Sequence, residues 1–454
     1  MGMSTTNPAT GETVKTYETW GETRLKEVLQ ACSERSKLWK TTDMQERCEL
    51  LRKCAKVIRD RSEELSAMIT LEMGKLIGES RGEVEKCASI CEYYADHGPG
   101  FLADEILESD AGRSLVAYQP LGIVLAVMPW NFPLWQVFRF AVPGLLAGNV
   151  GLLKHASNVP QCALAIESIF NDAGFPENTF KTLMIPASMV AHVIEDRRLH
   201  AVTLTGSEHA GKSVAGHAGQ ALKKSVLELG GSDAFIVLED ADLDWAVNQA
   251  VASRYLNCGQ SCIAAKRFIV VETIADDFVK RFASAVEELK PGDPMDEETT
   301  LAPMARHDLR DELHEQVLAS IAAGAVPVIG CAPESHQGAY YQASILDHVK
   351  HGMRAFEEEL FGPVAIVIRA KDEADAISIA NGSRFGLGGS VWTQDSARGE
   401  NVARQMECGS AFVNGMVKSD PRLPFGGVKA SGYGRELSSH GIREFVNAKT
   451  IWIK

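Results

Sequence analysis

The 454-residue chain lacks several features that mark common classes of protein. Its ten cysteines form no CxxC pair and no Cys/His spacing typical of zinc, so the sequence predicts no metal site and no disulfide framework. No apolar run reaches the ~18 residues that a membrane helix needs. The run from Leu121 to Met128 has only the length of a strand, and Pro129 ends it. Repeats and low-complexity segments are absent as well.

An excess of positive charge is also missing. The formal net charge of −14 argues against non-specific binding to nucleic acid. The hydrophobic share of 45% and the charged share of 23% are ordinary for a soluble globular protein. We expect no signal peptide and reduced thiols. The composition therefore predicts a cytoplasmic enzyme with no nucleic-acid or membrane partner.

Hydrophobic periodicity predicts an α/β protein with a helical beginning. Apolar residues recur at helical spacing over residues 24–105. Short apolar strands then alternate with helices, which is typical of a doubly wound parallel sheet. Because the chain is too long for one core, we expect two or three domains. The predicted strands are 150–153, 200–204, 234–238, 268–271, 326–329, 365–368 and 411–413, and the predicted helices of the alternating part include 160–173 and 209–220.

Two further segments suggest additional β structure. Ser114–Tyr118 and Ile123–Val127 flank a turn signal at Gln119–Gly122, which predicts a β-hairpin. The tail Lys449–Ile453 predicts one more strand, suited to pairing with the sheet edge of another subunit.

The segment Asn257–Cys262 is the strongest chemical signal. A thiol attacks a carbonyl carbon well only as a thiolate, and it needs mobile, polar surroundings. Gly259 provides backbone freedom, and Asn257 and Gln260 provide polar contacts to the candidate nucleophile, Cys262. Cys258 allows either a disulfide with Cys262 or a buried, inert thiol.

Two more motifs complete a set of groups that can oxidise an aldehyde through a thioester. Asn131, within Pro129–Pro133, offers a neutral amide that can hold an alkoxide without taking up its proton. Glu228 stands between two leucines, whose apolar surroundings raise a carboxyl pKa and suit it as general base for the water step. Each motif alone also fits an ordinary turn residue or strand-end carboxylate.

These motifs occur in one order together with Asn7–Glu12, Thr205–Ser207, Glu359–Pro363 and Pro424–Gly427. The chain thereby resembles the NAD(P)-dependent aldehyde dehydrogenases, and within them the bacterial succinate-semialdehyde dehydrogenases of the Sad type. The resemblance extends as far as Trp452. It implies a Rossmann-like cofactor domain (1–112 and 131–229), an α/β catalytic domain (230–435) and a small β oligomerisation arm (113–130 and 436–454). It also implies a homodimer or homotetramer.

The resemblance assigns a set of cofactor residues for NAD or NADP. Gly206 and Ser207 open a helix after a strand, where backbone N–H groups can meet a pyrophosphate, although a plain turn and helix cap fits them too. The resemblance places Lys154 and Ser157 at the adenosine ribose and Glu359 at the nicotinamide ribose. Because Ser157 does not repel a 2′-phosphate, we expect both cofactors to work. The other residues assigned to the cofactor are Trp130, Gly230 and Phe361.

The resemblance also implies a carboxylate-bearing substrate. Arg139 lies eight residues after Asn131, about two helical turns onward, so both can line one channel. It matches a carboxylate-binding arginine, and Ser419 lies near a substrate-contacting serine; a buried structural arginine paired with an internal acid is the alternative. Leu256 stands where some members have a second arginine.

The expected reaction is oxidation of succinate semialdehyde through a thiohemiacetal and a thioester that water hydrolyses, with broad aliphatic or aromatic aldehyde oxidation as the alternative. Intact Glu228 argues against release of the acyl group by CoA.

Overall fold

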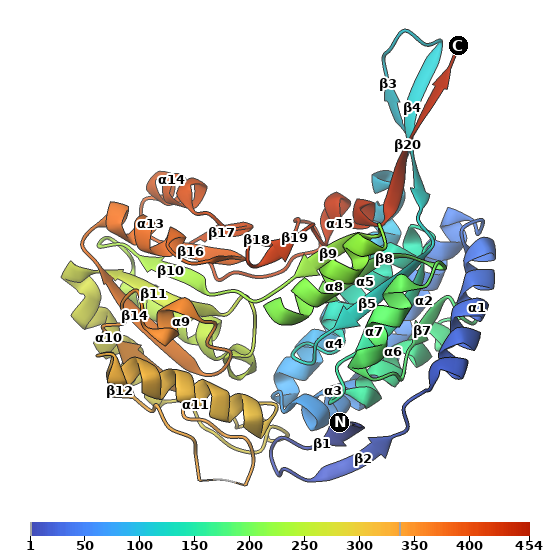
Figure 1. The fold of residues 1–454 in the computed structure, drawn as a ribbon. Helices are drawn as coiled ribbons and strands as arrows, with labels where there is room; N and C mark the ends of the chain where they lie inside the picture. Colours follow the sequence, from blue (N-terminus) through green and yellow to red (C-terminus); the bar gives the residue numbers. More distant parts are fainter. Residues whose placement is uncertain (1, 336) are drawn as a thin grey trace.

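The computed structural model describes residues 2–335 and 337–454. Two lobes, each built around its own sheet, lie side by side, and a thin β arm projects from the first lobe (Figure 1). The predicted α/β class is confirmed. Among the described residues, no helix is long and apolar enough to cross a membrane.

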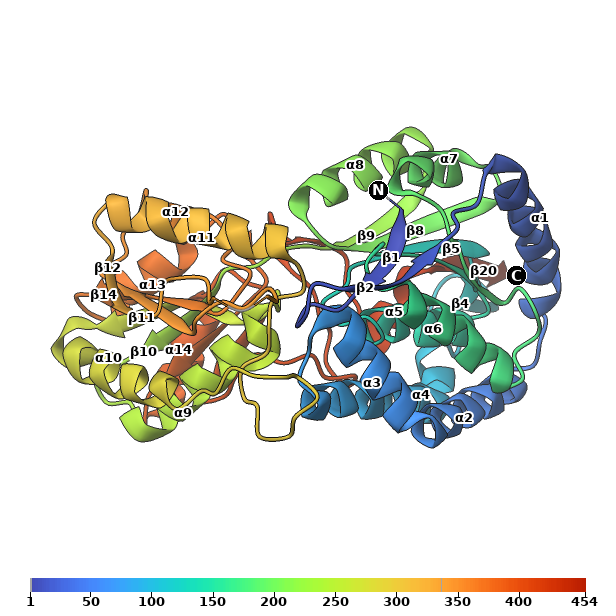
Figure 2. The same cartoon turned by 90° about the horizontal axis from the view of Figure 1, so that it is seen from below.

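The first lobe contains a six-stranded sheet in the order β19-β9-β8-β5-β6-β7. All neighbours pair in parallel except β19, which pairs antiparallel with β9. Its central strand is apolar on both faces, as a parallel strand covered by helices requires. Figure 2 shows α7 and α8 on one side of this sheet and α2, α4 and α6 on the other. The strands are β5 (Ile123–Met128), β6 (Val150–His155), β7 (Phe180–Thr182), β8 (Leu199–Thr205), β9 (Lys224–Glu228) and β19 (Gly432–Tyr433).

The helices of this lobe confirm the predicted helical beginning of the chain. A run of long amphipathic helices buries one apolar stripe each, with Cys54, Ile58 and Cys91 among the fully buried positions. The helices are α1 (Glu22–Trp39), α2 (Met44–Asp60), α3 (Ser62–Met73), α4 (Ile77–Phe101), α5 (Trp135–Leu146), α6 (Pro160–Asp172), α7 (Val190–Glu195), α8 (Glu208–Gln220) and α15 (Ser438–Glu444), with a 3₁₀ turn at Ala187–Met189.

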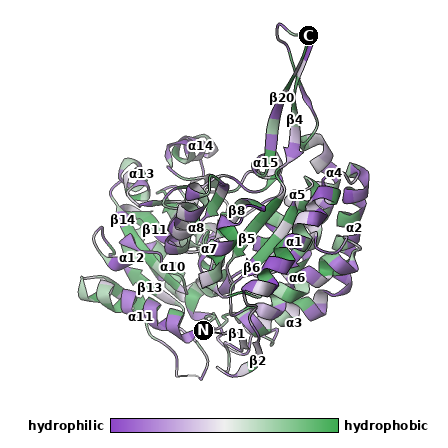
Figure 3. Cartoon of the chain, turned by 45° about the vertical axis from the view of Figure 1, so that its right-hand side comes forward, coloured by the Kyte–Doolittle hydropathy of each residue, from purple (hydrophilic) through white to green (hydrophobic). Residues whose placement is uncertain are grey.

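The second lobe contains a seven-stranded sheet in the order β12-β13-β14-β11-β10-β16-β17, parallel except at β12. Figure 3 shows the strands of both sheets as mainly apolar and the outward helix faces as mainly polar. The strands are β10 (Asp233–Val237), β11 (Ala265–Val271), β12 (Val326–Ile329), β13 (Ser344–Asp347), β14 (Val364–Ala370), β16 (Gly388–Trp392) and β17 (Ser410–Val413). The helices are α9 (Leu243–Tyr255), α10 (Glu272–Glu287), α11 (His307–Ala322), α12 (Arg354–Glu357), α13 (Glu373–Asn381) and α14 (Ser396–Gln405), with a 3₁₀ turn at Leu256–Gly259.

The predicted hairpin of Ser114–Tyr118 with Ile123–Val127 is wrong. The first segment lies in β4 (Arg113–Pro120), which pairs antiparallel with β3 (Glu105–Leu107) and β20 (Val446–Ile453) to form the arm. The second segment is β5, the centre of the first sheet. The range 113–130 predicted for the arm therefore includes a core strand of the first lobe.

The remaining strands form small ribbons. At the start of the chain, β1 (Met3–Thr6) pairs with β2 (Thr13–Tyr17), and β15 (Phe385–Gly386) pairs with β18 (Val428–Lys429). The predicted tail strand is confirmed as β20. It pairs with β4 of the same chain and lies at one edge of the three-stranded arm.

Candidate active site

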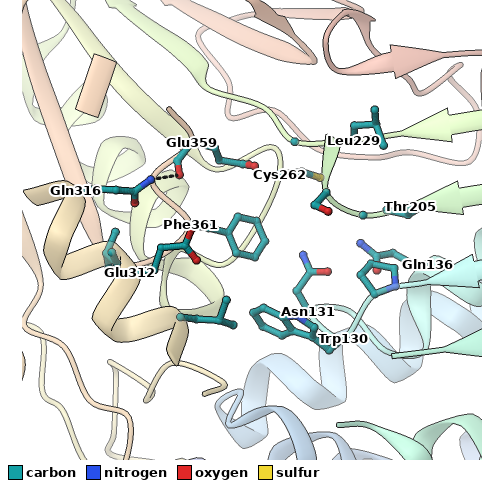
Figure 4. Close-up of a pocket in the computed structure, with 16 residues that line it drawn as sticks. Trp130, Asn131, Gln136, Thr205, Leu229, Cys262, Glu312, Gln316, Glu359 and Phe361 are labelled. Carbon is teal, nitrogen blue, oxygen red and sulfur yellow. Dashed lines mark hydrogen bonds between the residues drawn. The ribbon is translucent and has the colours of Figure 1, made fainter. Parts of the chain in front are cut away.

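Two cavities of about 290 Å³ each lie on either side of Cys262, which lines both of them, as does Gln136. The first, here called the cofactor-side cavity, lies between the lobes (Figure 4). Among its lining residues are the predicted Trp130, Asn131, Gly206, Ser207, Gly230, Glu359 and Phe361. The second, here called the substrate-side cavity, is lined by the predicted Arg139 and Ser419, together with residues of α4 and of the loop before Phe425.

The loop that carries Cys262 has an unusual backbone. Asn257, Cys258 and Gly259 all have positive φ, at 55°, 53° and 69°. A Cβ atom on Gly259 would lie 2.3 Å from the carbonyl oxygen of Gly362, so only glycine fits there. The fully buried Arg254 donates to carbonyls on both loops, those of Gly259 and Gly362. The nucleophile loop and the loop after Glu359 are thus fixed to each other.

The Cys262 side chain is partly buried, and charges of both signs act on its thiol. Burial raises its pKa to about 12, while Lys266 and Arg139 oppose that shift. Lys266 is buried directly behind it; its Nζ donates to the carbonyls of Ser261 (2.8 Å) and Cys262 (2.9 Å) and lies 3.2 Å from Oε1 of Glu359. The Cys262 backbone N–H has no hydrogen-bond partner among the described residues. It is therefore free to donate to an incoming oxygen.

Asn131 faces the same space as the Cys262 sulfur (Figure 4). Its Nδ2 donates to the carbonyl of Gln260 at 3.0 Å, which leaves the second N–H of the amide free. Nδ2 of Asn257 donates to the Asn131 carbonyl at 2.9 Å, which ties the two loops together. The side chain is nearly fully buried, so its remaining donor faces a site with little competing water.

The Glu228 carboxyl group lines neither cavity. It is buried at the end of β9, and neither of its oxygens has a hydrogen-bond partner among the described residues. Burial raises its pKa well above the usual value, and Glu436 raises it further, while Arg139 opposes the shift. A Cβ atom on Gly426 would lie 2.7 Å from Oε1 of Glu228, so the glycine leaves space for this inward position. Among the described residues, no hydrogen bond to this carboxyl group has to break for it to rotate out of its buried position.

The cofactor-side cavity has features that fit a dinucleotide. Trp130 and Phe361 form an apolar wall, with ring centroids 5.8 Å apart. Ser207 is the N-cap of α8, whose first N–H groups and helix dipole favour a phosphate. A Cβ atom on Gly230 would lie 2.2 Å from Oε2 of Glu359, so the absence of a side chain at Gly230 lets the backbone approach that carboxylate closely. The donor set therefore suits a pyrophosphate at one end and ribose hydroxyls at Glu359.

Two predicted cofactor residues lie outside the lining of this cavity. Lys154 is the penultimate residue of β6, and its Nζ donates to the carbonyl of His155 at 2.7 Å. Burial lowers the pKa of Lys154 to about 8. Ser157 follows the strand and is exposed, and its carbonyl accepts from the N–H of Ser4. Both residues stand at the carboxyl end of β6, next to the parallel strand β5 that leads into Trp130.

Arg139 lies on α5 and is buried in the wall of the substrate-side cavity. Its Nε forms an ion pair with Glu436, its guanidinium lies 4.7 Å from the centroid of the Phe425 ring, and its Nη2 is 3.4 Å from Thr205 Oγ1. The internal acid considered as the alternative partner is thus present. Burial raises the pKa of Glu436, and Arg139 opposes that shift.

Sequence reasoning missed three polar residues around Cys262. Gln136 follows Asn131 by five residues, and Lys266 follows Cys262 by four residues, but no motif distinguishes either from a solvated side chain. Lys86 of α4 lines the substrate-side cavity and lies in a segment interpreted only as helix. Cys258 is a free, buried thiol in the core of the second lobe, and burial raises its pKa, as expected for the inert alternative.

Comparison with known proteins adds the relationships of the whole chain. The aldehyde dehydrogenase family matches residues 1–451. A probable NADP(+) succinate-semialdehyde dehydrogenase of Synechocystis is 50% identical, with 100% of both chains covered. The Escherichia coli NAD(P)+ succinate semialdehyde dehydrogenase Sad is also 50% identical, with 98% of this chain and 96% of that protein covered. The structure of succinic semialdehyde dehydrogenase from Streptococcus pyogenes with NADP+ superposes with a TM-score of 0.98 at 38% identity, covering 99% of both chains.

Proposed function

Because the chain belongs to the aldehyde dehydrogenase family, we propose that it oxidises succinate semialdehyde to succinate with NAD or NADP. The observation that carries the proposal is the position of Cys262 between two cavities of different chemistry. One cavity suits a dinucleotide and the other presents cations to a small acid. The names of the relatives support the same substrate and the same cofactors.

The first step is the addition of the Cys262 thiolate to the aldehyde carbon. The new alkoxide receives hydrogen bonds from the free N–H of the Asn131 amide and from the Cys262 backbone N–H. Lys266 stabilises the thiolate from behind, because its charge opposes the effect of burial on the thiol pKa. When bound, NAD(P) supplies the hydride acceptor, and the sulfur is left as a thioester.

Hydrolysis of the thioester is the task of Glu228. Because burial and Glu436 raise its pKa, the carboxylate form of Glu228 is a stronger base and can take a proton from water. It needs to rotate from its buried position towards Cys262, and Gly426 borders the space in which it turns. The water oxygen attacks the thioester carbon as its proton passes to Glu228, and the C–S bond then breaks to release succinate and the Cys262 thiolate.

Most of the proposed binding residues line the same two cavities, and Lys154 and Ser157 lie beyond the cofactor-side cavity. Trp130, Phe361 and Glu359 hold the nicotinamide half of the cofactor, and Gly206, Ser207 and Gly230 border its phosphates. Lys154 and Ser157 hold the adenosine ribose. On the other side, Arg139 and Ser419 contact the distal carboxylate of the substrate, with Arg139 sharing its charge with Glu436.

The β arm suits contact with a second copy of the chain. Ile106, Leu107, Trp452 and Ile453 on it are about half exposed or more, which is costly for large apolar side chains in water. The outer edge of β20 also lacks a paired strand among the described residues. We therefore propose a homo-oligomer in the cytoplasm, with the two sheets forming a cofactor domain and a catalytic domain.

A panel of aldehydes with each cofactor tests the function. We expect formation of reduced cofactor, with kcat/KM for succinate semialdehyde at least about tenfold above that for butanal, since a charge-assisted contact contributes about 1.5–3 kcal/mol. Equal values for the two substrates would favour the broad aldehyde alternative. No oxidation of any aldehyde would contradict the proposal entirely.

A further inference from the structure

The substrate-side cavity is lined by four cationic side chains, and they differ in what balances their charge. Lys75 pairs with Glu83, and Arg139 pairs with Glu436. Lys418 is exposed, so water solvates it. Lys86 has neither an ion-pair partner nor full exposure to water. Within the described residues, no carboxylate lies close enough to form an ion pair with it, and the side chain is only partly exposed.

Lys86 is nevertheless held in a defined position. It projects from α4, on the same face as Glu79 and Glu83, which also line the cavity. Its Nζ donates to Ser419 Oγ at 2.7 Å and lies 4.2 Å from the centroid of the Trp135 ring. Burial and the charge of Arg139 lower its pKa to about 8, while Cys87, Glu83 and Asp420 oppose that shift.

A partly buried ammonium without a counter-ion is unfavourable, and a hydroxyl group and an aromatic face compensate it only in part. A ligand carboxylate would supply the missing negative charge. Two more donors lie beside it: the Ser419 hydroxyl, which accepts from Lys86 and keeps its own proton to donate, and Trp135 Nε1, which is buried without a hydrogen-bond partner. Trp135 lines the same cavity.

We propose that Lys86 is the principal counter-ion for the distal carboxylate of the substrate, with Ser419 completing the contact. This inference rests on the proposed function and deepens it. Arg139 then contributes less to this contact than Lys86, because its charge is largely taken up by Glu436. The substrate class is a short aldehyde with a carboxylate at the far end, with the aldehyde carbon at Cys262 and the carboxylate between α4 and Ser419.

The test compares Lys86→Met with Lys86→Arg and, as a matched control, Lys418→Met, which removes an exposed cation from the same cavity. We expect Lys86→Met to lower kcat/KM for succinate semialdehyde by roughly ten- to a hundred-fold, mostly through KM, and that for butanal by less than about threefold. Lys86→Arg should retain most of the preference, and Lys418→Met should keep nearly all of it. Similar losses on both substrates, or no loss, would overturn the inference.

A measurement on the unaltered enzyme covers the case in which Lys86→Met does not fold. Succinate should inhibit more strongly than butyrate at neutral pH, and this advantage should shrink well above the Lys86 pKa of about 8. A difference in inhibition between succinate and butyrate that does not change with pH would contradict the role of Lys86.

The two proposals fail in different ways. If the unaltered enzyme shows no preference for succinate semialdehyde over butanal, the proposed function fails. If the unaltered enzyme shows this preference and Lys86→Met keeps it, only the inference about Lys86 fails.

Discussion

The two cavities that meet at Cys262 have the same volume, about 290 Å³, but opposite electrostatics. Among the described residues, the side chains that line the cofactor-side cavity include two acids, Glu312 and Glu359, and no cation. The substrate-side cavity has four cations and only two acids, Glu79 and Glu83. We therefore expect the pyrophosphate of the cofactor to meet backbone N–H groups at the start of α8, and a small carboxylate to meet full side-chain charges.

This difference explains how one thiol can serve two very different ligands. Backbone donors bind phosphate at close range without attracting every anion in solution, because they carry no net charge. Side-chain cations instead select for charge, and their partners decide how much of it is available. The ion pair of Arg139 with Glu436 stabilises the wall, while Lys86 keeps its charge for a ligand.

The largest expected effect comes from removing the paired cation of the substrate-side cavity. Arg139→Met leaves Glu436 buried without its partner, so we expect a loss of about 3–5 kcal/mol in the free energy of unfolding, measured by denaturant titration. Activity on succinate semialdehyde should fall by roughly three- to tenfold, which is less than in Lys86→Met because Arg139 shares its charge with Glu436, and activity on butanal should fall less still. Adding Glu436→Gln should restore much of the stability but not the activity. Unchanged stability in Arg139→Met would show that the pair is not structural.

The pH dependence of kcat/KM distinguishes the ionisation of the Cys262 thiol from that of the Lys86 ammonium group. Because the pKa of Cys262 is raised to about 12 by burial, kcat/KM for butanal should rise with pH through the neutral range as the thiolate fraction grows. The ratio of succinate semialdehyde to butanal cancels this effect. It should fall above about pH 8, where Lys86 loses its proton under the influence of burial and Arg139, opposed by Cys87, Glu83 and Asp420. In Lys86→Arg the ratio should stay level; a falling ratio there would implicate another group.

A smaller effect is expected on the cofactor side. Ser157→Glu places a carboxylate where the adenosine ribose is proposed to lie, so kcat/KM for NADP should fall by roughly five- to tenfold, limited by solvent at this exposed position. The value for NAD should change little. Ser157→Ala, which adds no charge, serves as the control. Equal losses of kcat/KM with NAD and NADP in Ser157→Glu would indicate that the 2′-phosphate does not bind next to Ser157.

The local motifs predicted much of this site. Cys262, Asn131 and Glu359 each lie in a short segment whose residue types carry the chemistry, and the alternation of strands and helices predicted both sheets. The hairpin failed because Ile123–Val127 is a continuous apolar run. Such a run marks a strand buried on both faces but does not identify its partners.

Side chains whose surroundings come from distant segments could not be predicted. Lys86 is a single lysine on a helix. The two residues that hold its ammonium group, Trp135 and Ser419, lie far away in the sequence. The burial of Glu228 against Glu436 is likewise a tertiary contact. The resemblance to the family is confirmed by the comparisons. It did not predict the surroundings of Lys86 or those of Glu228.

The most direct test of the account is the state of Cys262 after one turnover in Glu228→Gln. Rapid mixing with NADP and succinate semialdehyde, followed by intact-protein mass spectrometry, should show a burst of reduced cofactor stoichiometric with active sites and a succinyl group on the protein. Cys262→Ala should give neither. Because hydride transfer precedes the water step, the acyl-enzyme should persist. Steady turnover at the unaltered rate without a burst or an added mass would contradict the thioester route and the role of Glu228.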